Sequence, residues 1–482
     1  MNNNCLVQPA SEENTDSVLV VDLDGTLCQT DTLHEGVLQL CKTEPLTLLR
    51  LPKWLYEGRA ALKTHVADIH ILDPDTLPMN DQVIELLQSA RAKGQITALV
   101  SAADHRQVTA VAQAIGLFDE AYGSAEGRNL KGAVKAEFLT ERFGHKKFDY
   151  IGDSRADLPV WTVARHAVTV NAGARLRQAA DDANPITQHL SSATNYTGAL
   201  FKALRPHQWS KNTLLFLPML ATHGLSQFVA VFLGFWSFCL LASAAYIIND
   251  LMDLNADRIH PRKRLRPFAS GALTALDGAR LVCGLLLASL ILGMLTRQPL
   301  FLVVLALYFV VTLTYSLWLK RKLIVDVLAL AGLYTVRVIA GAAAAAAILS
   351  PWMLGFSMFL FLALAAVKRQ AELMDLTATG RESAGRAYEA EDLPILRGIA
   401  LSASHAAVLV FALYISSDAV QTLYSQPEVL WLIPPLLLYW LLRMIMKTHR
   451  GQMTDDPIVY ATQDPSGLAL IVACASVVAS AI

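Results

Sequence analysis

The chain has 482 residues, of which 54% are hydrophobic and 17% are charged, and its formal net charge is −1. This composition is too apolar for a single soluble domain, and the length suggests two or more structural units. The six cysteines are scattered without paired spacing, so we expect neither disulfides nor a zinc site. We also expect no nucleic-acid partner.

The N-terminal part of the chain reads as a soluble α/β protein. Residues 1–16 form a polar tail without the apolar core of a cleavable signal peptide. Over residues 17–172, charges occur throughout, and short apolar runs rich in β-branched residues alternate with helical stretches. These runs predict parallel strands of a doubly wound sheet. We expect residues 173–200 to link this domain to the rest of the chain.

Three of the short apolar runs end in a reactive side chain. The run "VLVVDLDGT" ends in Asp22 and Asp24, "ITALVS" in Ser101, and "FDYIGD" in Asp153. Ligands bind at the carboxyl ends of parallel strands, which is where these residues fall. We expect Asp22 to attack a phosphate and form an aspartyl-phosphate, with Asp24 as general acid and then base. Ser101 would hydrogen-bond the phosphoryl group, a lysine would neutralise charge, and Asp153 with Asp22 would hold Mg²⁺.

These motifs resemble those of the haloacid dehalogenase superfamily of phosphatases. "DLDGT" is similar to the first motif, the serine of "LVSAAD" to the second and "GDSRAD" to the fourth. The resemblance implies a phosphatase whose Mg²⁺ is bound by acids of these motifs: Asp22, Asp24, Asp153 and Asp157. It also implies a catalytic lysine, which we assign to Lys131 in "NLKG", with Lys135 as the competitor.

Residues 31–78 lie between the first two motifs, where this superfamily carries a cap that selects the substrate. Lys53, Arg59 and Lys63 of this segment could meet an anionic ligand. Ordinary solvated helix faces are the favoured interpretation of these three cations.

Beyond residue 200, long charge-free runs predict a membrane domain over residues 201–482. We expect nine spans, at 207–222, 227–248, 276–296, 299–319, 324–346, 351–370, 395–416, 429–446 and 467–482. Cations collect before the first span and after the second, fourth, sixth and eighth, whereas the opposite loops hold almost none. The positive-inside rule therefore predicts a multi-pass protein of a bacterial-type inner membrane, with the N-terminal domain in the cytoplasm and the C-terminus outside.

The stretch after the second span, "NDLMDLNADRIHPRKRLRP", combines acids with cations. On a continuous helix, Asn249, Asp253 and Asp257 are spaced i, i+4, i+8 and line one face, with Asp250 beside them. Such a row of hard oxygen ligands suits Mg²⁺. Cations that suit phosphate come after it: Arg262, Lys263, Arg264 and Arg266. The positive-inside rule alone explains these cations equally well, but acids and cations together suggest a lipid-linked phosphate or diphosphate as the substrate.

The row "NDxxDxxxD" resembles the first motif of the UbiA superfamily of intramembrane prenyltransferases, and the resemblance covers about residues 198–482. It implies a nine-helix α-bundle whose active site faces the cytoplasm. The segments "RPHQWSKN", "HPRKRLRPFASG", "YTVRVIAGAAA", "KRQAEL" and "DDPIVYA" are similar to the decaprenyl-phosphate phosphoribosyltransferase branch. That branch moves a 5-phosphoribosyl group from phosphoribosyl diphosphate to a polyprenyl phosphate.

Aromatic prenyltransferases of this superfamily usually carry a second "DxxxD" motif after the sixth helix, and this chain has "KRQAELMD" there. The departure suits a donor with an extra phosphate. We expect the substrate phosphates to meet residues from several segments: Lys211, Arg262, Lys263, Arg266, Arg337, Lys368, Arg369 and Glu372. Arg337 lies inside the fifth span, where an unpaired charge is costly, so it either binds a substrate phosphate or pairs structurally with an acid.

The fusion of the two halves predicts a bifunctional enzyme. The membrane half would make a polyprenyl-phospho-ribose 5-phosphate, and the tethered phosphatase would remove the 5-phosphate at high effective concentration. Two alternatives stay open: an aromatic prenyltransferase that uses a prenyl diphosphate, fused to a phosphatase of other specificity, and a non-catalytic lipid-binding or transport module. A homo-oligomer is also an open alternative.

Overall fold

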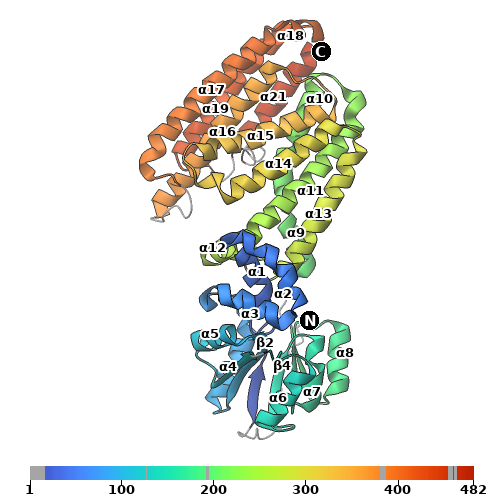
Figure 1. The fold of residues 1–482 in the computed structure, drawn as a ribbon. Coiled ribbons are helices and arrows are strands. Elements are labelled where there is room, and N and C mark those ends of the chain that lie inside the picture. The colour runs from blue at the N-terminus through green and yellow to red at the C-terminus, as the bar shows by residue number, and fades with distance from the viewer. Residues whose placement is uncertain are drawn as a thin grey trace, which may run out of the picture. The chain divides into compact units, whose positions relative to one another are not determined.

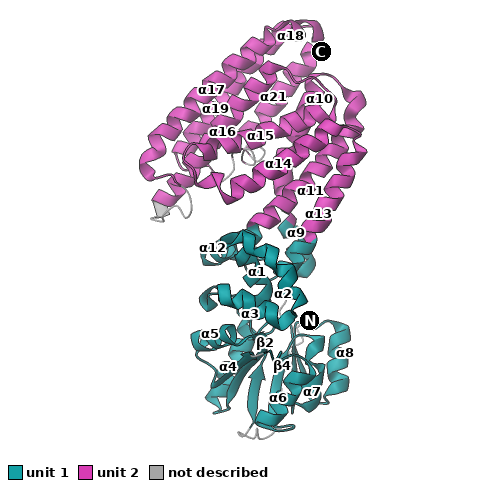
Figure 2. Cartoon of the chain, viewed as in Figure 1, with its two compact units in different colours: residues 1–203, 250–280 teal, residues 204–249, 281–482 magenta. Residues whose placement is uncertain are grey.

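The computed structural model describes residues 17–125, 127–191, 195–379, 387–453, 457, 460 and 464–482. The polar tail and most of "DDPIVYA" lie outside these residues. The chain divides into two compact units, coloured separately in Figure 2. Unit 1 holds residues 1–203 and 250–280, and unit 2 holds residues 204–249 and 281–482. The segment 250–280, which we expected within the membrane domain, therefore groups with the N-terminal domain.

Unit 1 is built on a six-stranded parallel sheet (Figure 1). Its strands are β1 Val18–Val21, β2 Thr97–Asp104, β3 Glu120–Ser124, β4 Phe148–Gly152, β5 Ala167–Val170 and β6 Thr187–Leu190. They lie in the order β3-β2-β1-β4-β5-β6, and every pairing is parallel. Strands β2 and β3 lie on one side of β1, and β4, β5 and β6 lie on the other, so the chain adds strands in both directions. The predicted doubly wound sheet is therefore confirmed.

Strand β1 is buried on both faces, which places the sheet between two helical layers. Leu19 and Val21 pack into the apolar cluster that contains residues of helices α4 (Asp81–Ala92) and α5 (His105–Ile115). The alternate residues Val18 and Val20 pack into the cluster on the opposite face. That face is covered by α6 Ala133–Phe143, α7 Leu158–Val163 and α8 Ala174–Ala183.

The expectation of a linker over residues 173–200 is wrong for most of that range. Helix α8 occupies residues 174–183, and β6 pairs with β5 from Thr187 to Leu190. The pattern was missed because β6 lies at the sheet edge and reads "TQHL", which is half-exposed and polar rather than an apolar run. Helix α9 (Tyr196–Leu204) begins within the last residues of that range.

The segment between β1 and β2 forms a helical cap, as expected for residues 31–78. Its elements are α1 Thr32–Thr43, η1 Pro45–Arg50, α2 Leu51–Tyr56, α3 Arg59–Ile69 and η2 Pro74–Thr76. Leu40, Trp54 and Val66 are buried in a small apolar core of the cap itself. Unit 1 also contains α12 Leu254–Ile259 and η6 Lys263–Leu265.

Unit 2 is all-helical, and seven helices of the described chain are long and apolar enough to cross a membrane. The principal helices are α11 Phe228–Met252, α13 Ala275–Leu295, α14 Pro299–Leu317, α15 Val325–Ala344, α16 Pro351–Thr379, α17 Leu393–Ile415 and α19 Ile433–His449. Helix α21 (Pro465–Ala481), at the predicted ninth span, is apolar but has 17 residues. Short helices complete the unit: η4 Pro206–Phe216, α10 Leu217–Ala221, η5 Leu225–Gln227, η7 Leu319–Arg321, η8 Ala390–Asp392, α18 Asp418–Leu423 and η9 Pro427–Leu432.

The nine predicted spans are thus confirmed only in part. The first predicted span, 207–222, is the 3₁₀ segment η4 followed by the short helix α10. Its polar residues Lys211 and Asn212 are buried, and η4 packs on α15 where Gly341 leaves room. A Cβ on Gly341 would lie 2.1 Å from the carbonyl oxygen of Leu215, so only glycine permits this approach.

Candidate functional site

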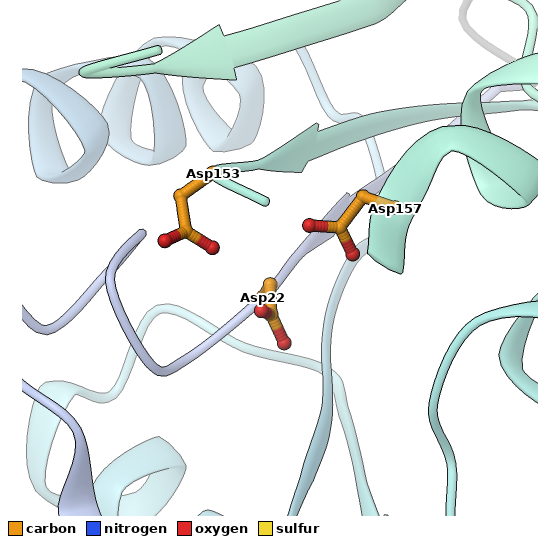
Figure 3. Close-up of side chains that lie close together, drawn as sticks. All are labelled: Asp22, Asp153 and Asp157. Atoms are coloured by element: carbon orange, nitrogen blue, oxygen red, sulfur yellow. The ribbon is translucent and has the colours of Figure 1, made fainter. Parts of the chain in front are cut away.

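Three carboxylates meet at the carboxyl-terminal edge of the sheet (Figure 3). Asp22 follows β1, Asp153 follows the neighbouring strand β4, and Asp157 comes from the short helix η3 (Arg155–Asp157). One oxygen atom of each residue lies within 4.8 Å of the others. Among the residues that the structure describes, no other group of acids, histidines and cysteines has this geometry.

The cluster has the chemistry of a magnesium site. Burial raises the pKa of Asp22 and of Asp153, and the carboxylate of Asp157 raises both further. Neighbouring buried carboxylates favour a bound cation, and carboxylate oxygens are the ligands that Mg²⁺ prefers. Asp22, Asp153 and Asp157 therefore fit the expected ion.

The lysine beside this cluster is Lys135, the competitor considered above, and not the predicted Lys131. The Nζ atom of Lys135 donates to Asp22 Oδ1 at 2.8 Å, and the side chain is almost fully buried. Burial alone lowers the pKa of Lys135, but the charges of Asp22 and Asp157 outweigh it and raise the pKa. Gly132 adopts a positive φ of 60°, so α6 begins at Ala133 and its first turn carries Lys135 inward, while Lys131 stays exposed in the preceding loop.

A buried tyrosine that the sequence analysis missed links the lysine to the acids. The hydroxyl of Tyr150 accepts from Lys135 at 2.9 Å and donates to Asp157 Oδ1 at 2.8 Å. The other oxygen of Asp157 accepts from the backbone N–H and the hydroxyl of Ser154. The signal available in the sequence was a tyrosine three residues before Asp153 in "FDYIGD". Tyr150 and Ser154 together fix the orientation of Asp157.

Asp24 lies next to the cluster but is not part of it, so its expected role as a metal-ligating side chain is not supported. Its Oδ1 accepts from the backbone N–H of Thr32, the first residue of cap helix α1. Burial and the nearby Asp31 raise the pKa of Asp24 to about 7. A carboxyl group with that pKa can both donate and accept a proton near neutral pH, as a general acid and base must.

Ser101 lies in β2 and is almost fully buried, and its Oγ accepts from the backbone N–H of Ala103. The glycine of "DLDGT" is required by space, because a Cβ on Gly25 would lie 2.1 Å from Asp153 Oδ2. The phosphatase motifs therefore meet at one edge of the sheet, as expected from the parallel topology.

One cap lysine reaches the sheet domain. Lys63 of α3 donates from Nζ to the carbonyl oxygen of Ala102, the residue after Ser101, at 2.5 Å. Burial lowers the pKa of Lys63, and the acidic groups at Asp24 and Asp31 oppose that shift. A small open cavity of about 30 Å³ lies beside it, lined by cap and sheet-domain residues that include Thr32, His70 and Asp104. The interpretation of solvated helix faces holds for the exposed Lys53 and Arg59 but is wrong for Lys63.

The acid row of the membrane half does not follow one continuous helix. Helix α11 ends at Met252, and Asp253 has φ −99° and ψ 12° as the N-cap of α12. The predicted i, i+4, i+8 face is therefore broken at its middle residue. Asn249 and Asp253 are half-buried, whereas Asp250 and Asp257 are buried.

Arg266 lies between the two buried acids. Its Nη1 atom is 3.1 Å from Asp250 Oδ1 and 2.5 Å from Asp257 Oδ2. Two buried carboxylates require a compensating cation, and in this conformation the guanidinium supplies it. Within the described residues, the row offers no oxygen cluster that fits a metal as it stands. The other predicted phosphate ligands of this loop, Arg262 and Lys263, are exposed.

The segment "KRQAELMD" contributes to a second charged cluster, within unit 2. Arg369 Nε lies 2.7 Å from Asp326 Oδ2, and Arg369 also bonds Glu372. The hydroxyl of Tyr315 donates to Asp326 Oδ1 at 2.9 Å. Asp326 and Arg369 are almost fully buried, and Lys368 is half-buried. Of the expected phosphate ligands, Arg369 thus bonds both Glu372 and Asp326, an acid that the sequence analysis did not single out.

Arg337 and Lys211 lie in the interior of unit 2. Arg337 donates from Nε to Asn212 Oδ1 at 2.9 Å and from Nη2 to the Tyr308 hydroxyl at 3.0 Å. Lys211 is buried, with Nζ 5.9 Å from the ring centre of Tyr334. Arg337 therefore has neutral hydrogen-bond partners on η4 and α14, and its phosphate-binding role stays a prediction.

The comparisons with known proteins concern both halves. The UbiA prenyltransferase family matches residues 213–463. A protein of Sinorhizobium fredii, "Uncharacterized protein y4nM", is 37% identical over 453 residues, which cover 92% of this chain and 87% of that protein. The decaprenyl-phosphate phosphoribosyltransferase of Mycolicibacterium smegmatis is 38% identical over 193 residues, which cover 39% of this chain and 60% of that protein. The N-terminal part resembles a substrate-bound phosphoserine phosphatase structure at 16% identity and a TM-score of 0.27, over 36% of this chain and 94% of that chain.

Proposed function

Because the chain belongs to the UbiA prenyltransferase family, we propose that its membrane half transfers a 5-phosphoribosyl group from phosphoribosyl diphosphate to a polyprenyl phosphate. The N-terminal domain then hydrolyses the 5-phosphate of the lipid-linked product. The similarity to a decaprenyl-phosphate phosphoribosyltransferase supports the first step, and the phosphatase motifs at the sheet edge support the second.

The observation that carries the donor assignment is the cluster of Arg369 with Asp326 and Glu372. Where an aromatic prenyltransferase has a second acidic motif, this chain has a buried guanidinium that already satisfies its acids. Such a site is less anionic than a second metal-binding motif would be. It therefore favours a donor that carries an additional phosphate, because a less anionic site repels that phosphate less.

The transfer step needs little from the protein beyond binding and orientation. An oxygen of the lipid phosphate attacks C1 of the ribose while the bond from C1 to the diphosphate oxygen breaks, and diphosphate leaves. The acceptor is already anionic, so no general base is required. Cations of unit 2, among them Lys211 and Lys368, hold phosphates in this scheme.

Magnesium enters the two halves differently. In the phosphatase domain, Asp22, Asp153 and Asp157 would hold the ion, which when bound neutralises charge on the phosphate under attack. In the membrane half, Asp250 and Asp257 bond Arg266, so these two acids could hold an ion only in a conformation in which Arg266 has another partner. A substrate phosphate is a chemically suitable alternative partner for the Arg266 guanidinium.

The phosphatase step uses the residues at the sheet edge. A carboxylate oxygen of Asp22 attacks phosphorus, the bond from phosphorus to the ribose O5 breaks, and Asp24 gives its proton to that oxygen. Asp24 then takes a proton from the water that hydrolyses the aspartyl-phosphate. In this scheme Lys135 offsets the negative charge around Asp22, and the Ser101 hydroxyl bonds the phosphoryl group.

The test is an assay on membranes that contain the protein, with Mg²⁺, phosphoribosyl diphosphate labelled in the ribose, and a polyprenyl phosphate. We expect label in the lipid phase, and less of it when Mg²⁺ is chelated. Absence of lipid label, together with activity on a hydroxybenzoate and a prenyl diphosphate, would replace the proposal with the aromatic alternative.

A further inference from the structure

A buried ion pair joins the phosphatase cap to the segment that carries the acid row. The guanidinium of Arg258 in α12 donates from Nη1 and Nη2 to the two carboxylate oxygens of Glu35 in α1, at 2.8 and 2.5 Å. Only 6% and 4% of these side chains are exposed. Breaking such a pair on one side leaves a buried charge without compensation. The cap and α12 are therefore held together within unit 1.

The contacts around the ion pair involve the base of the cap. A small cavity is lined by Leu38 and Leu72 of unit 1 together with Leu251 and Leu254. Leu251 lies in the last turn of α11, and Leu254 is the first residue of α12. Further along the segment, a Cβ on Gly271 would lie 2.7 Å from the Cβ of Gln29. Gln29 lies where the chain enters the cap, so the segment packs against one of the two connections between cap and sheet domain.

The same short helix connects this contact to the acid row. Helix α12 has six residues, and a helix of that length is not stable by itself in water. Asp257, next to Arg258, bonds Arg266. Arg258 also donates from Nε to the carbonyl oxygen of Ala269 at 3.2 Å, close in sequence to Arg266. Holding Arg258 in place therefore also holds the preceding residue, Asp257, and the segment around Ala269 to which the Arg258 side chain donates.

We propose that the phosphatase cap is a structural part of the transferase's acidic site: Glu35 is a positioning residue that, through Arg258, holds α12 and orients Asp257. The role of Asp257 in transfer rests on the proposed function. The positioning contact does not, because it concerns the conformation of residues 250–266 alone.

The test compares full-length variants in membranes or detergent. Glu35→Gln and Arg258→Gln each remove one partner, and the double variant removes both. Glu85→Gln is the matched control, because it removes one negative charge from an exposed side chain of α4. Hydrogen–deuterium exchange of peptides from residues 250–266 reports the conformation, and initial rates report the KM for each substrate.

We expect faster exchange of residues 250–266 in both single variants, and exchange closer to that of the wild type in the double variant, because no buried charge is then left alone. We expect the KM for phosphoribosyl diphosphate to rise roughly tenfold in Glu35→Gln while the KM for the lipid phosphate stays the same. Glu85→Gln should change neither quantity. Arg258→Lys, which keeps the charge but not the two-point contact, replaces Arg258→Gln should that variant fail to fold.

Unchanged exchange in Glu35→Gln and in the Arg258 variant would overturn the inference. Faster exchange with an unchanged KM would reduce the pair to a structural contact and overturn its role in transfer. If the wild type transfers no phosphoribosyl group at all, the proposed function fails, and the exchange experiment still decides whether Glu35 holds α12.

Discussion

Lys135 is the residue on which the electrostatics of the phosphatase site depend most. It is the cation bonded to Asp22, and it lies 3.9 Å from Asp157 Oδ1. We expect Lys135→Met to lower phosphatase kcat by roughly 10²- to 10³-fold, the range for loss of one preorganised charged group. Hydrolysis of a small phosphomonoester by the purified full-length protein measures this.

Lys131→Met is the matched control for Lys135→Met. Lys131 is exposed, four residues before Lys135, so its loss should leave kcat within roughly twofold of the wild type. The opposite ranking of the two variants would show that the chain binds substrate with Lys131 and that the buried lysine is structural.

The raised pKa of Asp24 predicts a pH dependence of stability in the magnesium-free protein. Between its ordinary pKa of 3.8 and its folded-state pKa of about 7, the native state holds a proton that the unfolded state has released. Stability from this group is therefore present at low pH and falls as the pH rises, by at most about 1.4 kcal/mol per pH unit.

The Asp24→Asn variant lacks this titration, so its thermal unfolding temperature should rise relative to that of the wild type as the pH goes from about 4 to about 7. Thermal unfolding in a chelating buffer measures the difference. A difference independent of pH would mean that the carboxyl of Asp24 ionises normally in the folded protein.

At this scale the sequence predicted the residues on strands or directly after them better than those carried by helices. Asp22, Ser101 and Asp153 could be placed because parallel strands bring their carboxyl ends to one edge. The choice between Lys131 and Lys135 depended on where α6 begins, and the Gly132 turn decided it. Nothing in the sequence pattern paired Arg266 with Asp250 or Arg258 with Glu35, because these contacts depend on tertiary packing.

Substitutions of two glycines in helix α15, Gly341 and Gly332, test how η4 packs against this helix. Gly341→Ala would place a Cβ 2.1 Å from the Leu215 carbonyl oxygen and force η4 away from α15. We expect a loss of about 1–3 kcal/mol in unfolding free energy. A Cβ on Gly332 meets nothing within 4 Å, so Gly332→Ala should be neutral or stabilising by up to about 1 kcal/mol.

Denaturant or thermal unfolding in detergent micelles compares the two variants directly. Equal effects of Gly341→Ala and Gly332→Ala would contradict the close contact between η4 and α15. A loss confined to Gly341→Ala would support it.

Among the elements, long periodic or apolar stretches were predictable and interruptions were not. The helices of spanning length, α11, α13 to α17 and α19, follow from long apolar runs. The break at Asp253 did not, because "NDLMDLNADRI" is compatible with a continuous helix and the turn is held by contacts of α12 with the cap. Edge strand β6 was missed for the related reason that an exposed edge needs no apolar pattern.

At the scale of the whole molecule, the chain joins a parallel α/β domain to a helical membrane domain of the UbiA family and does not divide at one point in the sequence. Residues 250–280 belong with the N-terminal domain, although they lie within the sequence of the membrane half. Composition predicted both halves, since charge-free runs begin only after residue 200. It could not predict the interleaved unit, because a buried ion pair between positions 35 and 258 leaves no periodic signal.

The most direct test of the account compares the lipid product of the wild type with that of Asp22→Asn. Both proteins receive labelled phosphoribosyl diphosphate and polyprenyl phosphate in membranes with Mg²⁺, and the lipid products are separated by charge. The account predicts polyprenyl-phospho-ribose from the wild type and a more anionic lipid, still bearing the 5-phosphate, from the variant. Identical products from the two proteins would contradict the claim that the N-terminal domain dephosphorylates what the membrane half makes.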